Sequence, residues 1–244
     1  MDADPAERIR EFQRKNRQFV IAYGGDGTVL DAVNQTAGKK AIIPVRNYGL
    51  CGLHKNYLDG ILDGKLEKQL KLTLCPFLEY SFNAGTFKNR GIAEVTVKNE
   101  DPTCAVRFNL HVDNRLYMKN VIADGIVLST SYGSTGYFKS VARCIFNMDA
   151  IGIAFIAPTQ GINNLVLNST SRIKIEFIRP AEVVVTADKS KDRVKAGKDD
   201  CIEVERTPDQ VSIFGLDEFH CQECRALRHS IVEAGIAVQD QYTV

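Results

Sequence analysis

The chain has 244 residues, of which 44% are hydrophobic and 25% are charged, and its formal net charge is +1. This composition is typical of a globular protein with one large domain or two domains of about 100 residues each. The near-neutral charge excludes a broad basic surface, so no nucleic-acid partner is expected. No apolar run reaches the roughly 20 residues that cross a bilayer, and the acidic, polar start is unlike a secretory signal. We therefore expect a cytoplasmic protein without a membrane segment.

The first part of the chain predicts an α/β layer. A helix is expected over residues 6–16, because Pro5 precedes it and Ile9 and Phe12 share one face. A short apolar strand at 18–23 leads into a glycine-rich turn. A helix at 28–36 and a buried strand at 41–45 follow. Strand, turn, helix and strand make a βαβ unit, which predicts a small parallel, Rossmann-like layer.

The remainder of the chain predicts β structure. Runs rich in β-branched residues, separated by polar turns, occur at 93–97, 106–112, 122–128, 151–177, 183–185, 202–204 and 211–214. The stretch 189–198 interleaves lysines with aspartates, which predicts a solvated turn. We therefore expect an α+β chain. It would consist of an α/β phosphate-binding domain at 1–60, a β-rich, β-sandwich-like domain at 61–215, and a C-terminal segment at 216–244. For this last segment, packing against the first domain is one alternative.

The glycine turn at residues 24–28 reads Gly-Gly-Asp-Gly-Thr and follows the first strand. Ligands bind at the carboxyl ends of parallel strands, and a helix N-terminus after a glycine turn suits a phosphate. We expect the phosphate to be held by Gly24, Gly25, Gly27 and Thr28. The carboxylate of Asp26 would repel a phosphate unless it accepts a proton or lies near a bound cation. Helix capping by Asp26 is the alternative interpretation.

A second segment, residues 129–137, carries seven hydroxyl side chains and two glycines and comes soon after Asp124 and Gly125. Hydroxyls donate and accept hydrogen bonds without adding charge. Such a segment suits a ligand with sugar hydroxyls, ring edges and phosphates. Serine and threonine are also common as loop formers and helix caps, which is the alternative here.

Together, the two segments resemble the NAD kinase family. The resemblance rests on the turn at 24–28, on Asp124 and Gly125, and on the order and spacing of residues 129–137. The turn alone is shared with lipid kinases and phosphofructokinase-like enzymes, so the second segment is the specific one. The similarity extends from about residue 19 to residue 185. It implies an N-terminal α/β domain followed by a β-rich domain, in a homodimer or homotetramer.

The resemblance also implies an activity and a site. The chain would phosphorylate the 2′-hydroxyl of the adenosine ribose of NAD to give NADP, with Asp26 as the base. The donor would be ATP or polyphosphate. Mg²⁺ would arrive with the nucleotide phosphates, and no metal site held by the protein alone is expected. The residues expected to bind NAD are Asn47, Glu94, Asp124, Thr135, Gly136, Tyr137 and Ser140.

The chain departs from the family pattern at several positions and is similar to a divergent, N-terminally short member. Ala93 stands where an asparagine precedes the glutamate, and Arg46 replaces a glycine-isoleucine pair. Residues 141–144 replace a glycine-glycine-proline, and Lys189 replaces a glycine after Asp188. Only about twenty residues precede the glycine turn, so the family's first strand and helix are expected to be missing. Two alternatives stay open: a superfamily kinase for another hydroxylated substrate (lipid, sugar or nucleotide), and a non-catalytic nucleotide-binding homologue.

The seven cysteines form no evident disulfide framework, because their number is odd and the chain is not small. Cys221 and Cys224 make a single Cys-x-x-Cys pair with His220 beside it. Structural zinc usually needs a second pair of ligands, and Cys201 would contribute only through folding. We expect packing or surface roles for this pair, with a metal site or a redox pair as alternatives. His54 is interpreted as a structural or exposed histidine.

Overall fold

The computed structural model describes residues 4–47, 51, 54, 56–65, 69–224 and 226–227. The chain divides into two compact units, residues 1–74 with 212–244 and residues 75–211. The first unit is α/β and the second is β-rich, which confirms the α+β fold class. The boundary expected near residue 60 falls inside the first unit, and the described part of the C-terminal segment belongs to that unit. No helix in the described ranges is long and apolar enough to span a membrane.

The first unit contains the predicted βαβ arrangement. Its elements in this region are α1 (Pro5–Lys15), β1 (Phe19–Tyr23), α2 (Asp26–Thr36), β2 (Ala41–Val45) and α3 (Tyr57–Leu62). β1 and β2 pair in parallel from Phe19 opposite Ala41 to Tyr23 opposite Val45. The end of β14 (Cys201–Phe214) adds to this sheet, because its Ile213 pairs in parallel with Ile42. Parallel pairing places the carboxyl ends of β1 and β2 at one edge of the sheet.

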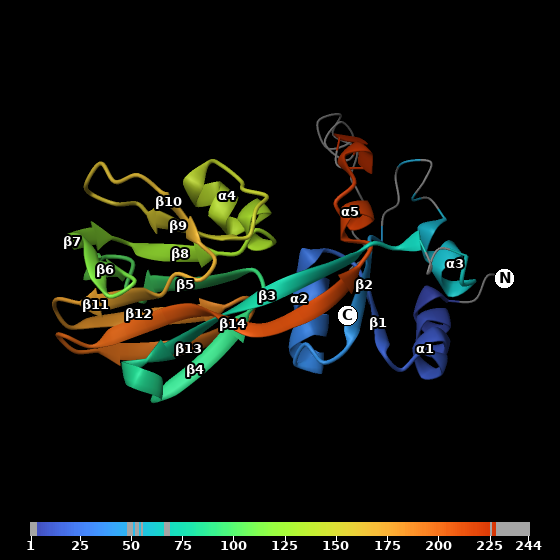
Figure 1. Cartoon of the computed structure of the whole chain (residues 1–244), viewed down its shortest axis with the longest axis horizontal. Coiled ribbons are helices and arrows are strands. Elements are labelled where there is room, and N and C mark those ends of the chain that lie inside the picture. Colours follow the sequence, from blue (N-terminus) through green and yellow to red (C-terminus); the bar gives the residue numbers. More distant parts are fainter. Residues whose placement is uncertain are drawn as a thin grey trace. The chain divides into compact units, whose positions relative to one another are not determined.

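Helices cover both faces of these strands. Figure 1 shows α1 and α2 on opposite sides of β1 and β2. As predicted, Ile9 and Phe12 form the buried stripe of α1, and they pack in one cluster with Ile21 and Ile43. Asp4 caps α1 by accepting the Ala6 N–H at 3.2 Å. Burying such apolar side chains stabilises the fold by roughly 1.5–3 kcal/mol each. This packing holds β1 in place, and the glycine turn follows the end of that strand.

The second unit is a β-sandwich. Its strands are β3 (Leu72–Phe82), β4 (Phe87–Gly91), β5 (Glu94–Asn99), β6 (Val106–Val112), β7 (Arg115–Ala123), β8 (Gly125–Ser129), β9 (Ala150–Ile156), β10 (Leu165–Asn168), β11 (Ile173–Phe177), β12 (Ala181–Ala187), β13 (Ser190–Ala196) and β14. One sheet has the order β14-β11-β6-β7, with β3 paired to β14 and to β4. The other is antiparallel, in the order β10-β9-β8-β5-β12-β13. Inward residues of both sheets share one buried core, which confirms the β-sandwich-like prediction.

Two short helices interrupt the strands beside β8. They are the 3-10 helix η3 (Gly133–Thr135) and the α-helix α4 (Tyr137–Ala142). Phe138 of α4 is buried with Phe146 against Val127 and Ala154, on a cluster separate from the sandwich core. Gly152 is needed below them, because a Cβ atom there would lie 2.5 Å from the Phe146 ring. The hydroxyl-rich segment is therefore anchored to the sheet at both ends.

Two local predictions were wrong. The lysine-rich stretch is not a turn: residues 190–196 form β13, which pairs with β12, and Val194 and Ala196 point into the core. Its charged side chains occupy the outward positions of a strand that is buried on one face. The run at 122–128 is not one strand either, because it breaks at Asp124 between β7 and β8.

Candidate active site

The glycine turn leaves the end of β1 and becomes the first turn of α2. Gly24 donates its N–H to the Val45 carbonyl at 2.8 Å, which ties the turn to the end of β2. Gly24 has φ +156°, and a Cβ atom there would overlap the Thr28 side chain. This position therefore requires glycine. The N-terminal N–H groups of a helix have no partners within the helix, so α2 presents donors and a positive dipole end next to Thr28.

Asp26 is the first residue of α2 and does not cap it. Gly25 occupies the N-cap position, and α2 has no side-chain cap. The Asp26 carboxylate instead meets two side chains of the same unit. Arg46 Nη2 donates to Oδ1 at 3.2 Å and to Oδ2 at 3.1 Å, and His220 Nε2 lies 3.3 Å from Oδ1. The capping interpretation is therefore wrong, because the carboxylate bonds to these side chains and not to the helix N–H groups.

These partners set the charge state of Asp26. Burial would raise its pKa, but the hydrogen bond from His220 and the charge and hydrogen bond of Arg46 outweigh burial and lower the pKa to about 2. The side chain of Asp26 is 56% exposed, whereas that of Arg46 is 13% exposed. The site thus holds an ionised carboxylate that solvent and a ligand can reach.

Arg46 is itself held by the segment that carries His220. Its Nε donates to the Phe219 carbonyl at 3.2 Å, and its guanidinium lies 3.6 Å from the centre of the Phe219 ring. Phe219 ends the short helix α5 (Leu216–Phe219), and His220 is its C-cap. In the sequence, Arg46 stood out only as a departure from the family pattern, and His220 only as a neighbour of Cys221. No local pattern connects residues 26, 46 and 220, so sequence reasoning missed this arrangement.

Asn47 follows Arg46 at the carboxyl edge of the first unit's sheet and is exposed. Its position beyond β2 corresponds to that of the glycine turn beyond β1, because the two strands are parallel and in register. The following residues of the expected asparagine-glycine loop, 48–50, lie outside the described residues. Asn47 and Asp26 therefore belong to the same edge of one sheet.

Glu94 lies in the second unit, at the start of β5. Its Oε2 is buried and has no hydrogen-bond partner among the described residues. Burial, followed by the charge of Asp188, raises the pKa of Glu94 to about 7, although a backbone hydrogen bond from Phe138 opposes this shift. A buried polar atom without a partner is costly in a folded protein. Glu94 is thus a carboxyl group whose empty acceptor position suits a ligand hydroxyl.

Asp188 holds the backbone in front of Glu94. Its carboxylate accepts the N–H groups of Ile92, Ala93 and Glu94 at 2.8, 2.9 and 3.0 Å. Burial raises the pKa of Asp188, and the three backbone hydrogen bonds oppose that rise. The residue sits in a turn with φ +50°. Asp188 therefore positions Glu94, a role that the sequence did not reveal.

The hydroxyl-rich segment divides into an inner and an outer set. The inner hydroxyls are buried and bonded within the protein: Thr130 Oγ1 donates to the Ile92 carbonyl at 2.6 Å, and Ser134 Oγ donates to the Phe146 carbonyl at 3.0 Å. The outer residues Thr135, Gly136 and Tyr137 are exposed, as is Ser140 just beyond the segment. The loop-forming interpretation is thus right for the inner hydroxyls, whereas the outer set faces solvent.

Asp124 does not lie beside Glu94 within the chain. β5 and β8 are antiparallel, with Glu94 opposite Ser129 and Lys98 opposite Gly125. Asp124 precedes Gly125, and its carbonyl accepts the Asn99 N–H at 3.0 Å. The strand rises about 3.3 Å per residue, so the length of β8 separates Asp124 from Glu94 and Thr135.

Comparisons with known proteins point to one family. The model of the ATP-NAD kinase C-terminal domain matches residues 92–215, just over half of the chain. A bifunctional NADP phosphatase/NAD kinase of Methanococcus maripaludis is 28% identical over 189 residues, which are 73% of this chain and 33% of that protein. An NAD kinase of Christiangramia forsetii is 27% identical over 178 residues, 68% of this chain and 60% of the relative.

A solved structure has the same fold over almost the whole chain. The NAD kinase from Archaeoglobus fulgidus, in complex with ATP, superposes with a TM-score of 0.70 at 21% identity and covers 95% of this chain and 96% of that one. The chain spans about a third of the M. maripaludis relative and 60% of the C. forsetii relative.

Proposed function

The chain belongs to the NAD kinase family, and we propose that it transfers a phosphoryl group from ATP to the 2′-hydroxyl of the adenosine ribose of NAD, giving NADP. The observation that carries this proposal is the ionised, solvent-accessible carboxylate of Asp26 on a glycine turn at the carboxyl edge of a parallel sheet. The matched relatives are NAD kinases, alone or joined to a phosphatase.

The phosphate end of the reaction belongs to the first unit. We assign the donor phosphates to the N-terminus of α2, where Gly24, Gly25 and Gly27 let the backbone approach and Thr28 adds a hydroxyl. Arg46, 3.1 Å from Asp26 Oδ2, brings a positive charge to the same place. Phosphoryl transfer depends mainly on alignment and charge neutralisation. Asp26 would accept the proton of the ribose hydroxyl.

Mg²⁺ would enter this site with the nucleotide. It prefers oxygen ligands and is usually held by one or two carboxylates together with substrate phosphates. The reachable Asp26 carboxylate fits that role. Across the ranges that the structure describes, the group of potential metal ligands that lie together consists of cysteines and a histidine, which do not suit Mg²⁺. A bound ion would neutralise phosphate charge.

The NAD end of the reaction belongs to the second unit. Glu94 presents a buried oxygen without a partner among the described residues, and a ribose hydroxyl would satisfy it. The exposed residues Thr135, Gly136, Tyr137 and Ser140 follow on η3 and α4. We also assign Asn47 to the ligand, on the first unit. Ala93, in place of the family's asparagine, removes one side-chain contact.

A homodimer or homotetramer would explain the position of Asp124. Within one chain the length of β8 separates it from Glu94, and we propose that a second copy supplies this carboxylate to the NAD site. Light scattering during size-exclusion chromatography measures the mass. A monomer under conditions of full activity would remove Asp124 from the site.

A non-catalytic nucleotide-binding role is the second candidate, because Arg46 and His220 already occupy the Asp26 carboxylate. The purified chain should be incubated with Mg²⁺ and NAD or NADH, using ATP, other triphosphates or polyphosphate as the donor. NADP formation that requires donor and Mg²⁺ supports the kinase. Phosphoryl transfer from the donor that requires another hydroxylated acceptor would point to a different substrate, and nucleotide binding without turnover would point to the second candidate.

A further inference from the structure

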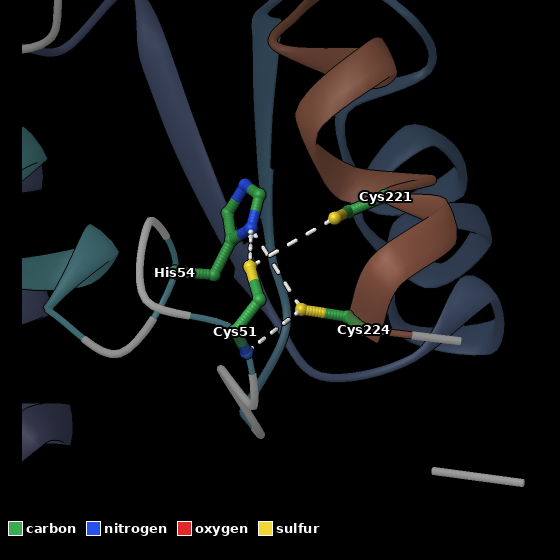
Figure 2. Close-up of side chains that lie close together, drawn as sticks. All are labelled: Cys51, His54, Cys221 and Cys224. Carbon is green, nitrogen blue, oxygen red and sulfur yellow. Dashed lines mark hydrogen bonds between the residues drawn. The ribbon is translucent and has the colours of Figure 1, made fainter. Parts of the chain in front are cut away.

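Four soft-ligand side chains converge in the first unit, from two segments far apart in the sequence. Cys51 and His54 follow β2, whereas Cys221 and Cys224 follow α5 (Figure 2). Their ligand atoms all lie within 4.8 Å of one another. The second ligand pair that the Cys-x-x-Cys motif lacked in the sequence is therefore a Cys-x-x-His motif about 170 residues upstream. We call these four residues the Cys/His cluster.

The spacing of the ligand atoms fits a single tetrahedral ion. Zinc lies about 2.3 Å from sulfur and about 2.0–2.1 Å from a histidine nitrogen, so two ligands of a tetrahedron are about 3.6–3.8 Å apart. The sulfurs of Cys51 and Cys221 are 3.9 Å apart, and Cys224 Sγ lies 3.7 Å from His54 Nδ1. Cys51 Sγ lies 2.9 Å from the same nitrogen. A small outward shift of that pair would admit an ion.

The surroundings of the cluster also favour a bound thiolate. Cys51 and Cys224 are buried, at 2% and 6% exposure. The Cys51 N–H points at Cys224 Sγ at 3.5 Å, and such backbone donors stabilise thiolates at metal sites. Cys51, Cys221 and Cys224 are all free thiols, and the 3.9 Å between the sulfurs of Cys51 and Cys221 far exceeds the S–S bond length of about 2.05 Å.

We propose that Cys51, His54, Cys221 and Cys224 bind one structural zinc ion. Three thiolates and one imidazole form a closed set of four ligands, which is typical of structural zinc and leaves no position for a substrate. Soft thiolates select zinc over Mg²⁺ or Ca²⁺. This site shares no residue with the proposed phosphate or NAD sites, so zinc binding is measured separately from the proposed kinase activity.

The ion would join the two segments that hold Asp26. Arg46 lies five residues before Cys51, and His220 immediately precedes Cys221. Both contact the Asp26 carboxylate. A zinc ion that links Cys51 to Cys221 would therefore fix α5 and the end of β2 as one frame around the carboxylate. Its role is structural and involves no reaction at the metal.

The test begins with the unaltered 244-residue chain, purified without chelator and supplied with zinc alone. We expect one zinc per chain by elemental analysis. Replacement with Co²⁺ should give the visible bands of a tetrahedral ion and a near-ultraviolet thiolate-to-metal band. Alkylation should spare Cys51, Cys221 and Cys224 until a chelator is added, whereas the exposed Cys104 and Cys144 react throughout.

Variants locate the site. Cys51→Ser and Cys221→Ser should each weaken zinc binding at least as much as the 10–100-fold loss typical of outer-shell changes. Cys144→Ser, an exposed cysteine of the second unit, is the matched control and should retain full zinc. The Co²⁺ spectrum and alkylation of the unaltered chain keep the test valid if a serine variant fails to fold.

Three results would overturn the proposal. The first is unaltered chain without zinc after reconstitution. The second is a Co²⁺ spectrum without the thiolate band. The third is peptide mapping that finds Cys51 and Cys221 joined by a disulfide in freshly isolated protein, which would assign the cluster to redox chemistry.

Discussion

The guanidinium of Arg46 donates to both carboxylate oxygens of Asp26, at 3.2 Å to Oδ1 and 3.1 Å to Oδ2. This ion pair, together with His220, holds the pKa of Asp26 at about 2 against the effect of burial. Such a carboxylate is ionised at neutral pH, but it is a weak base. Donor phosphates would compete for Arg46, and its withdrawal would return Asp26 toward ordinary basicity as the substrate hydroxyl arrives.

Replacing Asp26 by asparagine should abolish most turnover while the fold and nucleotide binding persist. A general base contributes roughly 10²–10⁴-fold, so NADP formation should fall by at least about that factor. The affinity for ATP in the absence of Mg²⁺ should stay the same or increase, because a negative charge near the phosphates is removed. Asp63→Asn, in an exposed ion pair of the same unit, is the control. Equal turnover in Asp26→Asn and the unaltered chain would exclude Asp26 from catalysis.

Replacing Arg46 by alanine should raise the pKa of Asp26 from about 2 toward or beyond its ordinary 3.8. Burial raises this pKa, and the substitution removes the charge and hydrogen bond of Arg46 that lower it. In the unaltered chain the lowered pKa of Asp26 stabilises the fold above pH 3.8, and this stabilisation is lost as the pH falls through 2. The stabilisation is small, because the Asp26 side chain is exposed to solvent. Carboxyl ¹³C NMR titration measures the pKa directly. We also expect weaker ATP binding, measured by calorimetry.

Two variants separate charge from packing in that experiment. Arg46→Lys keeps the charge but loses the guanidinium's planar fork, so the pKa of Asp26 should rise less than in Arg46→Ala. Arg8→Ala breaks the ion pair with Asp59 in the same unit and should leave Asp26 unaffected. An Asp26 pKa that stays near 2 in Arg46→Ala would show that Arg46 does not control it.

The sequence predicted the parts of this fold that depend on local pattern. The βαβ unit, with its glycine turn, was evident because hydrophobic periodicity and turn residues act over a few positions. β13 was not, because the outward charges of residues 190–196 masked the inward Val194 and Ala196. A charge run and the exposed face of a half-buried strand look alike when the partner strand is unknown.

The candidate site shows the same division. Asp26 was predicted from a motif and Glu94 from the family resemblance, whereas Arg46, His220 and Asp188 act through contacts between distant segments. Predicting the Cys/His cluster would have required knowing that the sulfurs of Cys51 and Cys221, separated by 170 residues in the sequence, lie 3.9 Å from each other. Cysteine spacing predicts a metal site only when both ligand pairs are evident, and the upstream pair here is a cysteine and a histidine in a loop.

Gly133→Ala should destabilise the second unit. A Cβ atom at Gly133 would lie 2.5 Å from the Ala93 carbonyl carbon and 2.7 Å from Ser129 Oγ. Overpacking of this kind costs about 1–3 kcal/mol, because the backbone beside Glu94 must move. Urea unfolding measures the loss. Gly161→Ala, where a Cβ atom has no heavy atom within 4 Å, should leave stability unchanged or slightly raised. Equal effects of the two substitutions would contradict the close approach of Ala93 and Ser129 to Gly133.

Glu94→Gln should stabilise the folded chain at alkaline but not at acidic pH. Burial and the charge of Asp188 raise the pKa of Glu94 from 4.5 to about 7, so the folded chain holds this proton more tightly than the unfolded chain. The unaltered chain therefore loses stability as the pH rises from 4.5 through 7, by at most about 3 kcal/mol. Glutamine carries no charge and avoids that loss.

The measurement is the free energy of unfolding of both chains between pH 5 and pH 8, at about unit intervals. The difference between Glu94→Gln and the unaltered chain should grow with pH and level off above 7. Glu182→Gln, at an exposed ion pair with Lys195, is the control and should show no such growth. If the difference in unfolding free energy between the two chains does not depend on pH, Glu94 ionises at its ordinary pKa. That result would contradict the assignment of its buried oxygen to a ligand hydroxyl.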